Sequence, residues 1–209
     1  MYNIRPASIH HVDGIARVHV ACWTECYPYL PSEMHRIRGI DYRRKQWQTK
    51  LSSPGMHMTW ILSDASGIAG FSHIQLNMDP DLPVGGVELH ACYFLPRLRR
   101  GLAGPNMMQE MLQYARSEGH ASCSIWAWDS NPLRRTYNAL GFLPLVRRMR
   151  VIGGAMAPEV GYHCDDLDRL ERRLVRSIKS LGQRDVQTRN LQYSPDRFRP
   201  TALRSCIGQ

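Results

Sequence analysis

A chain of 209 residues is long enough for one well-buried domain with an appendage and too short for two full domains. Hydrophobic residues form 43% of it and charged residues 22%, which is ordinary for a globular protein. No window approaches the ~18 uninterrupted apolar residues of a membrane helix, and the first residues hold no apolar signal segment. We therefore expect a cytoplasmic protein with no membrane partner.

The six cysteines are scattered along the chain without a C-x-x-C pair. Without a secretory signal, this distribution favours free thiols in a reducing compartment. Cys22 and Cys26 stand one helical turn apart, a spacing that suits a metal, but no second ligand pair has a matching spacing. We therefore expect no metal site.

The N-terminal part of the chain predicts one strand followed by two helical segments. Residues 2–8 read as the short strand. Apolar residues recur with helical spacing over residues 9–27, and two prolines then stop the helix. A second helical segment covers residues 32–53 and ends before a Pro-Gly pair.

The middle of the chain predicts three strands and a helix. Residues 58–64 and 67–76 form two strands joined by a turn, and a third apolar strand over residues 85–96 ends at a proline. A turn with two arginines and two glycines follows. It leads into a helix with an apolar stripe, which Gly119 closes.

A strand, a short helix and two further strands complete the predicted domain. Residues 121–128 predict a strand, and residues 132–140 a short helix ended by a glycine. The last two strands are predicted at residues 142–154 and 159–167. Past Asp168 the pattern changes to an Arg-rich helix and then to a polar, irregular segment, so we place the domain boundary after residue 168.

The turn at residues 96–104 carries a chemical prediction of its own. A glycine-rich turn that feeds a helix N-terminus leaves several backbone N–H groups without helical partners, and the helix dipole adds partial positive charge there. Such a place suits a phosphate group. A plain connection between strand and helix is the alternative, because glycine-rich turns before helices are common.

Most of the net charge of +9 lies after Glu171. A basic tail can dock on RNA, DNA or an acidic partner through salt-sensitive attraction. The tail holds no nucleic-acid motif, and Tyr193 and Phe198 are its only aromatic residues. We therefore expect a solvated tail and no nucleic-acid partner, and we keep a binding module centred on the tail as an alternative function.

Four segments in this order resemble the GNAT superfamily of acetyl-CoA-dependent N-acetyltransferases. They are the opening strand and helices, the strand–loop–helix around "FLPRLRRGLAGPNMMQEML", the segment "NPLRRTYNALGF", and the closing strand pair. The resemblance implies an α/β (α+β) fold with a mixed, mostly antiparallel twisted sheet of about seven strands flanked by about four helices, followed by a basic C-terminal tail. Residues 1–168 would form this GNAT-like domain, and residues 169–209 a basic helix and an irregular tail.

The family's pyrophosphate loop reads Gln/Arg-x-x-Gly-x-Gly/Ala. Arg99 and Gly104 match its first and last places in the frame that we prefer. Leu102 then stands where the family has its first glycine, whereas a frame shifted by one residue puts Gly101 and Ala103 on the small positions. Because glycine lets backbone approach a phosphate closely, Leu102 is a departure that bears on cofactor affinity.

The resemblance implies contacts to acetyl-CoA, as co-substrate, along the strand end, the loop and the later helix. The expected cofactor-binding residues are Tyr93, Phe94, Leu95, Arg99, Arg100, Gly101, Leu102, Ala103, Gly104 and Asn131. Asn131 lies one residue closer to Tyr137 than its counterpart does in the family.

Glu88 and Tyr137 are the expected catalytic residues. Glu88 matches the place of the general base in many members, and strand alternation puts it on the face of Phe94. A carboxylate there can take the proton of the attacking amine, and a solvent-facing glutamate is the alternative. Tyr137 keeps its spacing to the Gly-Phe pair and matches the acid that protonates the departing thiolate, whose pKa is comparable to that of a phenol.

Trp23, Tyr27 and Tyr29 match the aromatic end of the first helix, which borders the acceptor pocket in relatives. The expected reaction is direct transfer of an acetyl group from acetyl-CoA to a primary amine in a ternary complex. The identity of the amine and the oligomeric state, with a homodimer as one option, stay open. A GNAT-fold protein that has lost catalysis is a further alternative, suggested by Leu102 and the shortened Asn–Tyr spacing.

Overall fold

The computed structural model describes residues 2–192, with side chains up to residue 183. Seven strands form one sheet: β1 Asn3–Pro6, β2 His57–Asp64, β3 Gly67–Leu76, β4 Val87–Phe94, β5 Cys123–Trp128, β6 Leu143–Ile152 and β7 Ala155–Cys164. Their order in the sheet is β1-β2-β3-β4-β5-β7-β6, and only β4 and β5 run parallel. The expected mixed, mostly antiparallel sheet is confirmed.

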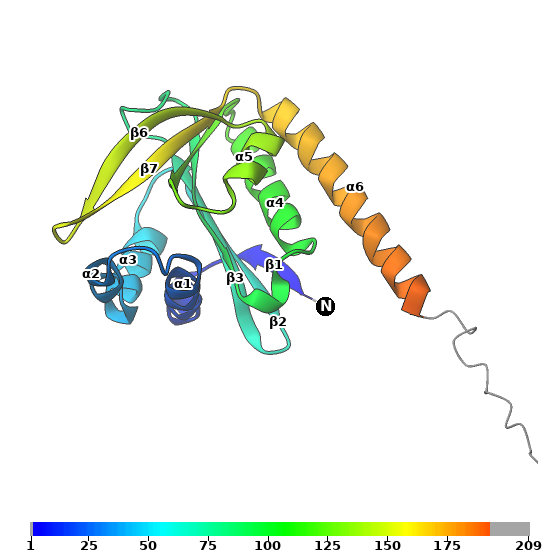
Figure 1. The fold of residues 1–209 in the computed structure, drawn as a ribbon, viewed down its shortest axis with the longest axis horizontal. Coiled ribbons are helices and arrows are strands. Elements are labelled where there is room, and N and C mark those ends of the chain that lie inside the picture. The colour runs from blue at the N-terminus through cyan, green and yellow to red at the C-terminus, as the bar shows by residue number, and fades with distance from the viewer. Residues whose placement is uncertain (1, 193–209) are drawn as a thin grey trace, which may run out of the picture.

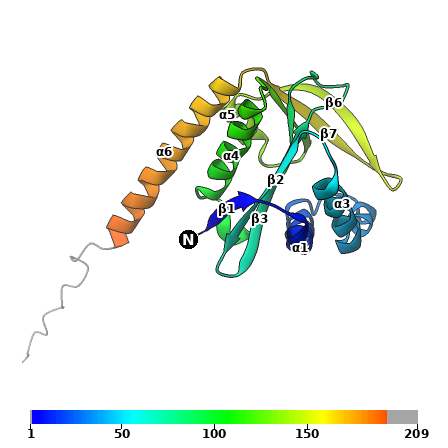
Figure 2. The same ribbon diagram turned by 180° about the vertical axis from the view of Figure 1, so that it is seen from behind.

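Helices cover both faces of this sheet (Figure 1). One group lies on one side: the 3-10 turn η1 Ile9–His11, α1 Val12–Cys26, α2 Ser32–Ile37 and α3 Ile40–Ser52. The other group lies on the opposite side: the 3-10 turn η2 Pro96–Leu98, α4 Ala103–Ser117, α5 Arg134–Leu140 and α6 Leu167–Gln192. The reverse view shows the same two groups separated by the strands (Figure 2). Within residues 2–192, no helix has the length and apolar character needed to cross a membrane.

Each face of the sheet has its own apolar core. Towards α4 and α6, strand residues such as Ile74 and Leu89 pack with Met107 and Leu112. Towards α1 and α3, Trp47 is fully buried in a second cluster with neighbours from β2 and β3. The stripe of apolar residues that predicts the helix after the glycine-rich turn is thus the buried face of α4.

The predicted helix over residues 32–53 is two helices in the structure. α2 ends at Ile37 and α3 begins at Ile40. The break occurs because Gly39 has extended backbone angles, φ −66° and ψ −174°, and serves as the N-terminal cap of α3. The part of the chain that the structure describes therefore holds six α-helices where about four and a tail helix were expected.

α6 packs on the body of the protein at its N-terminal end. Leu167, Leu170 and Leu174 are buried in the same cluster as the apolar face of α4. The predicted boundary after residue 168 therefore coincides with the start of a helix that shares this core. The irregular segment was expected to begin after Gly182, but α6 continues to Gln192, so that expectation was wrong for residues 183–192. The rest of the expected irregular tail lies outside the described residues.

The parallel pair β4 and β5 is a short one. Only Val87 with Cys123 and Glu88 with Ser124 are in register, although both strands continue for several residues. Beyond Glu88 the facing edges of the two strands have no strand partner within the described sheet. Their backbone N–H and C=O groups are therefore available to a ligand that lies between them.

A β-bulge in β4 corrects one expectation. Ile74 of β3 pairs with Leu89, but the preceding residue of β3, His73, pairs with Ala91, so His90 is the extra residue. One extra residue reverses the alternation of side chains along a strand. Glu88 therefore lies on the face of Ala91, towards α1 and α3, whereas Phe94 packs in the cluster towards α4. The expectation that Glu88 and Phe94 share a face was wrong.

Candidate active site

Two cavities lie next to the diverging strands β4 and β5. The larger has a volume of about 1060 Å³ and is walled by β4, β5, α4, α5 and α6. The smaller has a volume of about 130 Å³ and is walled by α1, α3, β4, β5, β6 and β7. They have five lining residues in common, which are Tyr27, His90, Ala91, Tyr93 and Trp126. The two cavities therefore adjoin where the parallel pair opens.

The predicted phosphate loop lies at the wall of the larger cavity. Arg99, Arg100, Gly101 and Gly104 line this cavity, whereas Leu102 does not, so the leucine side chain does not block the loop. Within the described chain, the backbone N–H groups of residues 101–104 donate no hydrogen bond to protein. Unpartnered amides at the start of the 15-residue helix α4 suit an anion.

The backbone of this loop departs from ordinary geometry at one residue. Arg100 has φ +65°, in the left-handed region that favours glycine. Such a conformation costs about 1 kcal/mol or more for a residue with a side chain and is often retained where function requires it. The side chain of Arg100 lines the large cavity together with that of Arg99.

The guanidinium of Arg99 is engaged within the protein. It donates to both carboxylate oxygens of Glu25, at 2.8 and 3.0 Å, and its Nε donates to the carbonyl oxygen of Phe94 at 2.7 Å. Cys22 donates its thiol to the same carbonyl at 3.3 Å. Arg99 thus connects the end of α1 to the end of β4.

The other predicted cofactor residues divide into two groups. Tyr93, Phe94 and Asn131 line the large cavity. Leu95 and Ala103 do not, because their side chains pack in the cores, and Ala103 is 2% exposed. Ala103 therefore offers only its backbone to a ligand.

Tyr137 lines the large cavity from α5. Its backbone carbonyl closes the helix by accepting from Gly141, which has φ +108°. Burial, reinforced by the neighbouring Cys92 and Tyr93, raises the pKa of the Tyr137 phenol. The phenol is therefore protonated at neutral pH, as a proton donor must be.

α6 supplies a part of this cavity that the sequence analysis did not assign to a site. Its lining residues are Leu174, Arg176, Ser177, Ser180 and Leu181. The apolar spacing within "RLERRLVRSIKSL" is the signal that could have placed this helix against the domain.

Glu88 lies in the smaller cavity, and its carboxylate is anchored on two sides. Gln75 donates from Nε2 to Oε2 at 2.8 Å, and Nδ1 of His90 lies 3.0 Å from Oε1. Burial opposes ionisation, but the bonds from His90 and Gln75 and the charge of Lys50 lower the pKa of Glu88 below its ordinary value. Glu88 is thus an ionised carboxylate at neutral pH.

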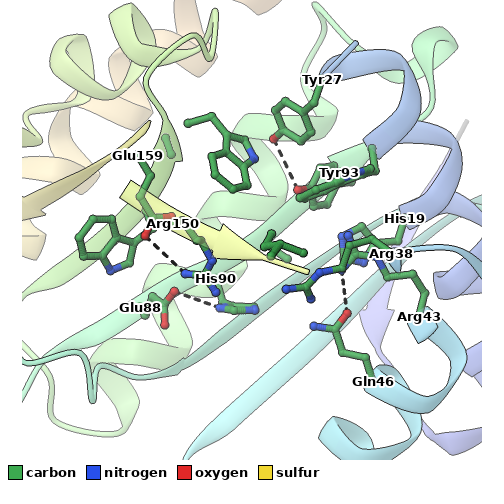
Figure 3. Close-up of a pocket in the computed structure, with 16 residues that line it drawn as sticks. His19, Tyr27, Arg38, Arg43, Gln46, Glu88, His90, Tyr93, Arg150 and Glu159 are labelled. Atoms are coloured by element: carbon green, nitrogen blue, oxygen red, sulfur yellow. Dashed lines mark hydrogen bonds and ion pairs between the residues drawn. The ribbon is translucent and has the colours of Figure 1, made fainter. Parts of the chain in front are cut away.

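His90 is a second candidate that sequence reasoning did not assign to this site. Its position in the bulge places it against both cavities, and its ring contacts Glu88 (Figure 3). Nδ1 is the ring nitrogen that faces the carboxylate, and Nε2 is directed away from it. The Glu–x–His spacing within a strand was the available signal, because residues two apart in a strand lie on the same face.

Two of the three predicted acceptor-pocket aromatics reach a cavity. Trp23 lines the smaller cavity and Tyr27 lines both, and the Tyr27 hydroxyl lies 3.5 Å from that of Tyr93. Tyr29 lines neither cavity and is 42% exposed. It lies beyond the end of α1, in the turn that the two prolines form, and its ring packs against Tyr27.

The smaller cavity also holds charged residues from elements that sequence reasoning did not connect. Arg38 and Arg43 come from the region of α2 and α3, and Arg150 and Glu159 come from β6 and β7 (Figure 3). No local motif signals them, because they meet only through the fold. Among the described residues, no cluster of three or more His, Cys, Asp or Glu side chains could hold a metal ion.

Comparison with known proteins finds relatives of this chain. A model of the acetyltransferase (GNAT) family matches residues 14–142, which include Glu88, the loop and Tyr137. The chain is 26% identical over 181 residues to the uncharacterized N-acetyltransferase YuaI of Bacillus subtilis, a match that covers 84% of this chain and 100% of that protein.

Solved structures share the fold. A GCN5-related N-acetyltransferase from Rhodopseudomonas palustris aligns with a TM-score of 0.62 at 16% identity, over 78% of this chain and 94% of that one. The yncA protein of Salmonella typhimurium, solved with acetyl-CoA, aligns with a TM-score of 0.57 at 14% identity, over 79% of this chain and 94% of that one. Since the family model covers more than half of the chain, this protein belongs to the GNAT family of acetyltransferases.

Proposed function

We propose that this acetyltransferase transfers an acetyl group from acetyl-CoA to a primary amine by direct attack in a ternary complex. The observation that carries the proposal is the meeting of two unlike cavities at the opening between β4 and β5. An ionised carboxylate, Glu88, lies in one, and a protonated phenol, Tyr137, lies in the other. The amine attacks the thioester carbon on one side and needs a base there. The thiolate departs on the other side and needs a proton donor there.

The larger cavity fits acetyl-CoA in size and in chemistry. Its volume of about 1060 Å³ suits a long ligand, and its walls offer apolar side chains, two unpaired strand edges and the amides of residues 101–104. Amides at a helix N-terminus would hold the pyrophosphate, and strand edges would pair with the amides of the pantetheine arm. The yncA protein, which has the same fold, binds acetyl-CoA.

Glu88 acts as the base in this proposal. The amine nitrogen forms a bond to the thioester carbon as the carbon–sulfur bond breaks, and the nitrogen gives up one proton. Glu88 takes this proton, directly or through one water. His90 and Gln75 fix the orientation of the carboxylate, which leaves its remaining lone pairs for the amine.

Tyr137 completes the proton balance. The departing group is the thiolate of CoA, and the phenol of Tyr137 donates a proton to its sulfur. The backbone between Tyr93 and Leu95 is the expected support for the thioester carbonyl. The Phe94 carbonyl cannot donate to it and already accepts from Arg99 and Cys22. The Leu95 N–H already donates to Ala69, so only the remaining N–H groups of this segment can serve.

Calorimetry with acetyl-CoA and an assay of thiol release with a panel of amines test the proposal. Binding in the micromolar range together with amine-dependent thiol release supports the enzyme. Absence of binding at millimolar acetyl-CoA would mean a fold that has lost the activity. Salt-sensitive RNA binding that disappears when the chain is cut after residue 168 would point instead to a module centred on the tail.

A further inference from the structure

The guanidinium of Arg43 is buried at the smaller cavity without an opposite charge. Arg43 is 3% exposed, and its Nη1 donates to the amide oxygen of Gln46 at 2.8 Å. Its Nε and Nη2 have no hydrogen-bond partner among the described residues. Burial, together with the charge of the neighbouring Arg38, lowers its pKa to about 10. A buried cation without a counter-ion destabilises the protein, so an anionic ligand would be bound favourably here.

Arg38 adds a second cation at the same end of the cavity. Its Nε is buried and unpartnered, and its guanidinium bonds the hydroxyl of Tyr42. Neither Arg38 nor Arg43 forms an ion pair with a carboxylate of the described chain. The indole N–H of Trp23, over which Arg43 is stacked, is buried and unpartnered as well.

The acidic residues of the cavity lie on the opposite side, and one of them is already neutralised (Figure 3). Glu159 accepts from Arg148 at 2.8 Å and lies 3.5 Å from Arg150. Glu88 is held by Gln75 and His90 and faces the cavity. The cavity therefore has unpaired positive charge at one end and the expected base at the other.

The size of the cavity limits what can lie between these ends. Its volume of about 130 Å³ is close to that of an engineered cavity of about 150 Å³ that holds benzene. An acceptor that reaches from Glu88 to Arg38 and Arg43 is therefore a small molecule.

From this arrangement we infer that the acetyl acceptor is a small amine that also carries a carboxylate, in the manner of an amino acid. The inference rests on the proposed function. Its amine lies towards Glu88, and its carboxylate accepts from the guanidinium groups of Arg43 and Arg38 and from the indole of Trp23. Two parallel bonds from a planar guanidinium match the geometry of a carboxylate. Arg38 and Arg43 are thus specificity-determining residues.

The test compares amino acids with their carboxamides and with the corresponding decarboxylated amines as acceptors. Each set keeps the amine and the side chain, and only the anionic group changes. Thiol release from acetyl-CoA gives kcat/KM for each compound. We expect the carboxylate to exceed the carboxamide by on the order of 100-fold, because a buried guanidinium left unpaired disfavours the neutral analogue.

Arg43→Met removes the charge and keeps an unbranched side chain over Trp23, and Arg38→Met does the same at the neighbouring position. Either substitution should reduce the preference for carboxylate to within about threefold while leaving acetyl-CoA affinity unchanged. Arg36→Met is the matched control, because Arg36 lies on α2, is paired with Glu33 and does not line the cavity. Thermal unfolding monitored by circular dichroism identifies a variant that fails to fold, in which case Arg43→Gln replaces it.

A binding measurement separates this inference from the proposed function. Tryptophan fluorescence is titrated with sodium propionate, propanamide and propylammonium, since three tryptophans line the cavity. Saturable binding of propionate and of neither other compound, lost in the Arg43 variant and kept in Arg36→Met, supports the carboxylate subsite independently of acetyl-CoA binding. Failure of acetyl-CoA to bind would overturn the proposed function and not this subsite. If amines without a carboxylate are acetylated as well as amino acids, or if propionate does not bind, the inference is wrong while the acetyltransferase stands.

Discussion

The two cavities are built on different principles. The larger one is formed mainly by apolar walls, the facing edges of β4 and β5, and the backbone amides of the loop before α4, with further sides closed by α1, α5 and α6. The smaller one is formed by charged and aromatic side chains from six separate elements. Its two carboxylates and several of its cations are held by specific bonds, including Gln75 to Glu88 and Arg148 to Glu159.

This difference separates the binding groups that the fold itself provides from those that depend on the side chains of this protein. Backbone groups bind a ligand through the geometry of the fold, and many sequences can provide them. Side chains that converge from distant segments determine which acceptor enters. We therefore expect substitutions in the smaller cavity to alter turnover and specificity, and substitutions at the loop of the larger cavity to alter cofactor affinity by smaller factors.

The largest effect is expected from Glu88→Gln. Loss of the base should lower kcat by about 10²- to 10⁴-fold while acetyl-CoA affinity, measured by calorimetry, stays nearly unchanged. Glu110→Gln, at an exposed position on α4, is the control. Because the pKa of Glu88 is lowered, its carboxylate persists through neutral pH, and its contribution should be lost only as pH falls below the ordinary range of glutamate. Unchanged turnover would remove Glu88 from the role of base.

Tyr137→Phe tests the acid on the other side of the opening. We expect kcat to fall by about 10²-fold, with little change in acetyl-CoA affinity, because only the departing thiolate loses its proton donor. Burial raises the pKa of this phenol, so the wild-type rate should not decline at alkaline pH until above the ordinary range of tyrosine. Tyr114→Phe, on α4 outside both cavities, is the control. A variant with full activity would show that water protonates the thiolate.

Arg176→Gln examines the wall that α6 adds to the larger cavity. Arg176 is exposed, so its attraction for the phosphates of CoA is screened, and we expect the Kd for acetyl-CoA to rise about two- to fivefold. The rise should shrink in high salt. Arg172→Gln changes the same charge one turn earlier, outside the cavity, and should have no effect on the Kd. If both substitutions change the Kd equally, the effect comes from the overall positive charge of α6, and Arg176 makes no specific contact with CoA.

The smallest effect is expected from Leu102→Gly. Leu102 does not line the cavity and has ordinary helical backbone angles, φ −77° and ψ −10°, so a glycine is not required there. The Kd for acetyl-CoA should stay within about twofold, which corresponds to less than about 0.4 kcal/mol. Binding that tightens about tenfold would show that the leucine hinders the approach of phosphate to the loop amides, as the family pattern suggests.

The sequence predicts the helices and strands well where the hydrophobic periodicity agrees with the glycine and proline residues that end an element. The strand over residues 67–76 has the predicted bounds, and Gly141 ends α5 with a positive φ as expected. The break between α2 and α3 was missed, because the helical pattern continues across Gly39. A single glycine inside such a pattern is compatible with both an unbroken helix and a cap.

The site is less predictable than the fold, for a physical reason. The resemblance to the family indicates the loop, Glu88 and Tyr137, since the family's motifs are recognised from neighbouring residues along the chain. The face of Glu88 was predicted wrongly, because sequence alternation does not reveal a bulge at His90. Arg43, Arg150 and Glu159 meet only after three parts of the chain are folded together, and no pattern in one segment carries that information.

The bulge at His90 has a consequence for engineering this enzyme. Deleting that one residue would restore a regular ladder between β3 and β4 with Glu88 still opposite Gln75, but it would remove the imidazole that contacts the Glu88 carboxylate and lines both cavities. Both chambers would then lose part of their lining through a change of one codon. Shortening the loop at residues 77–86 would remove no residue that lines either cavity, so tolerance to length changes should differ sharply between these nearby segments.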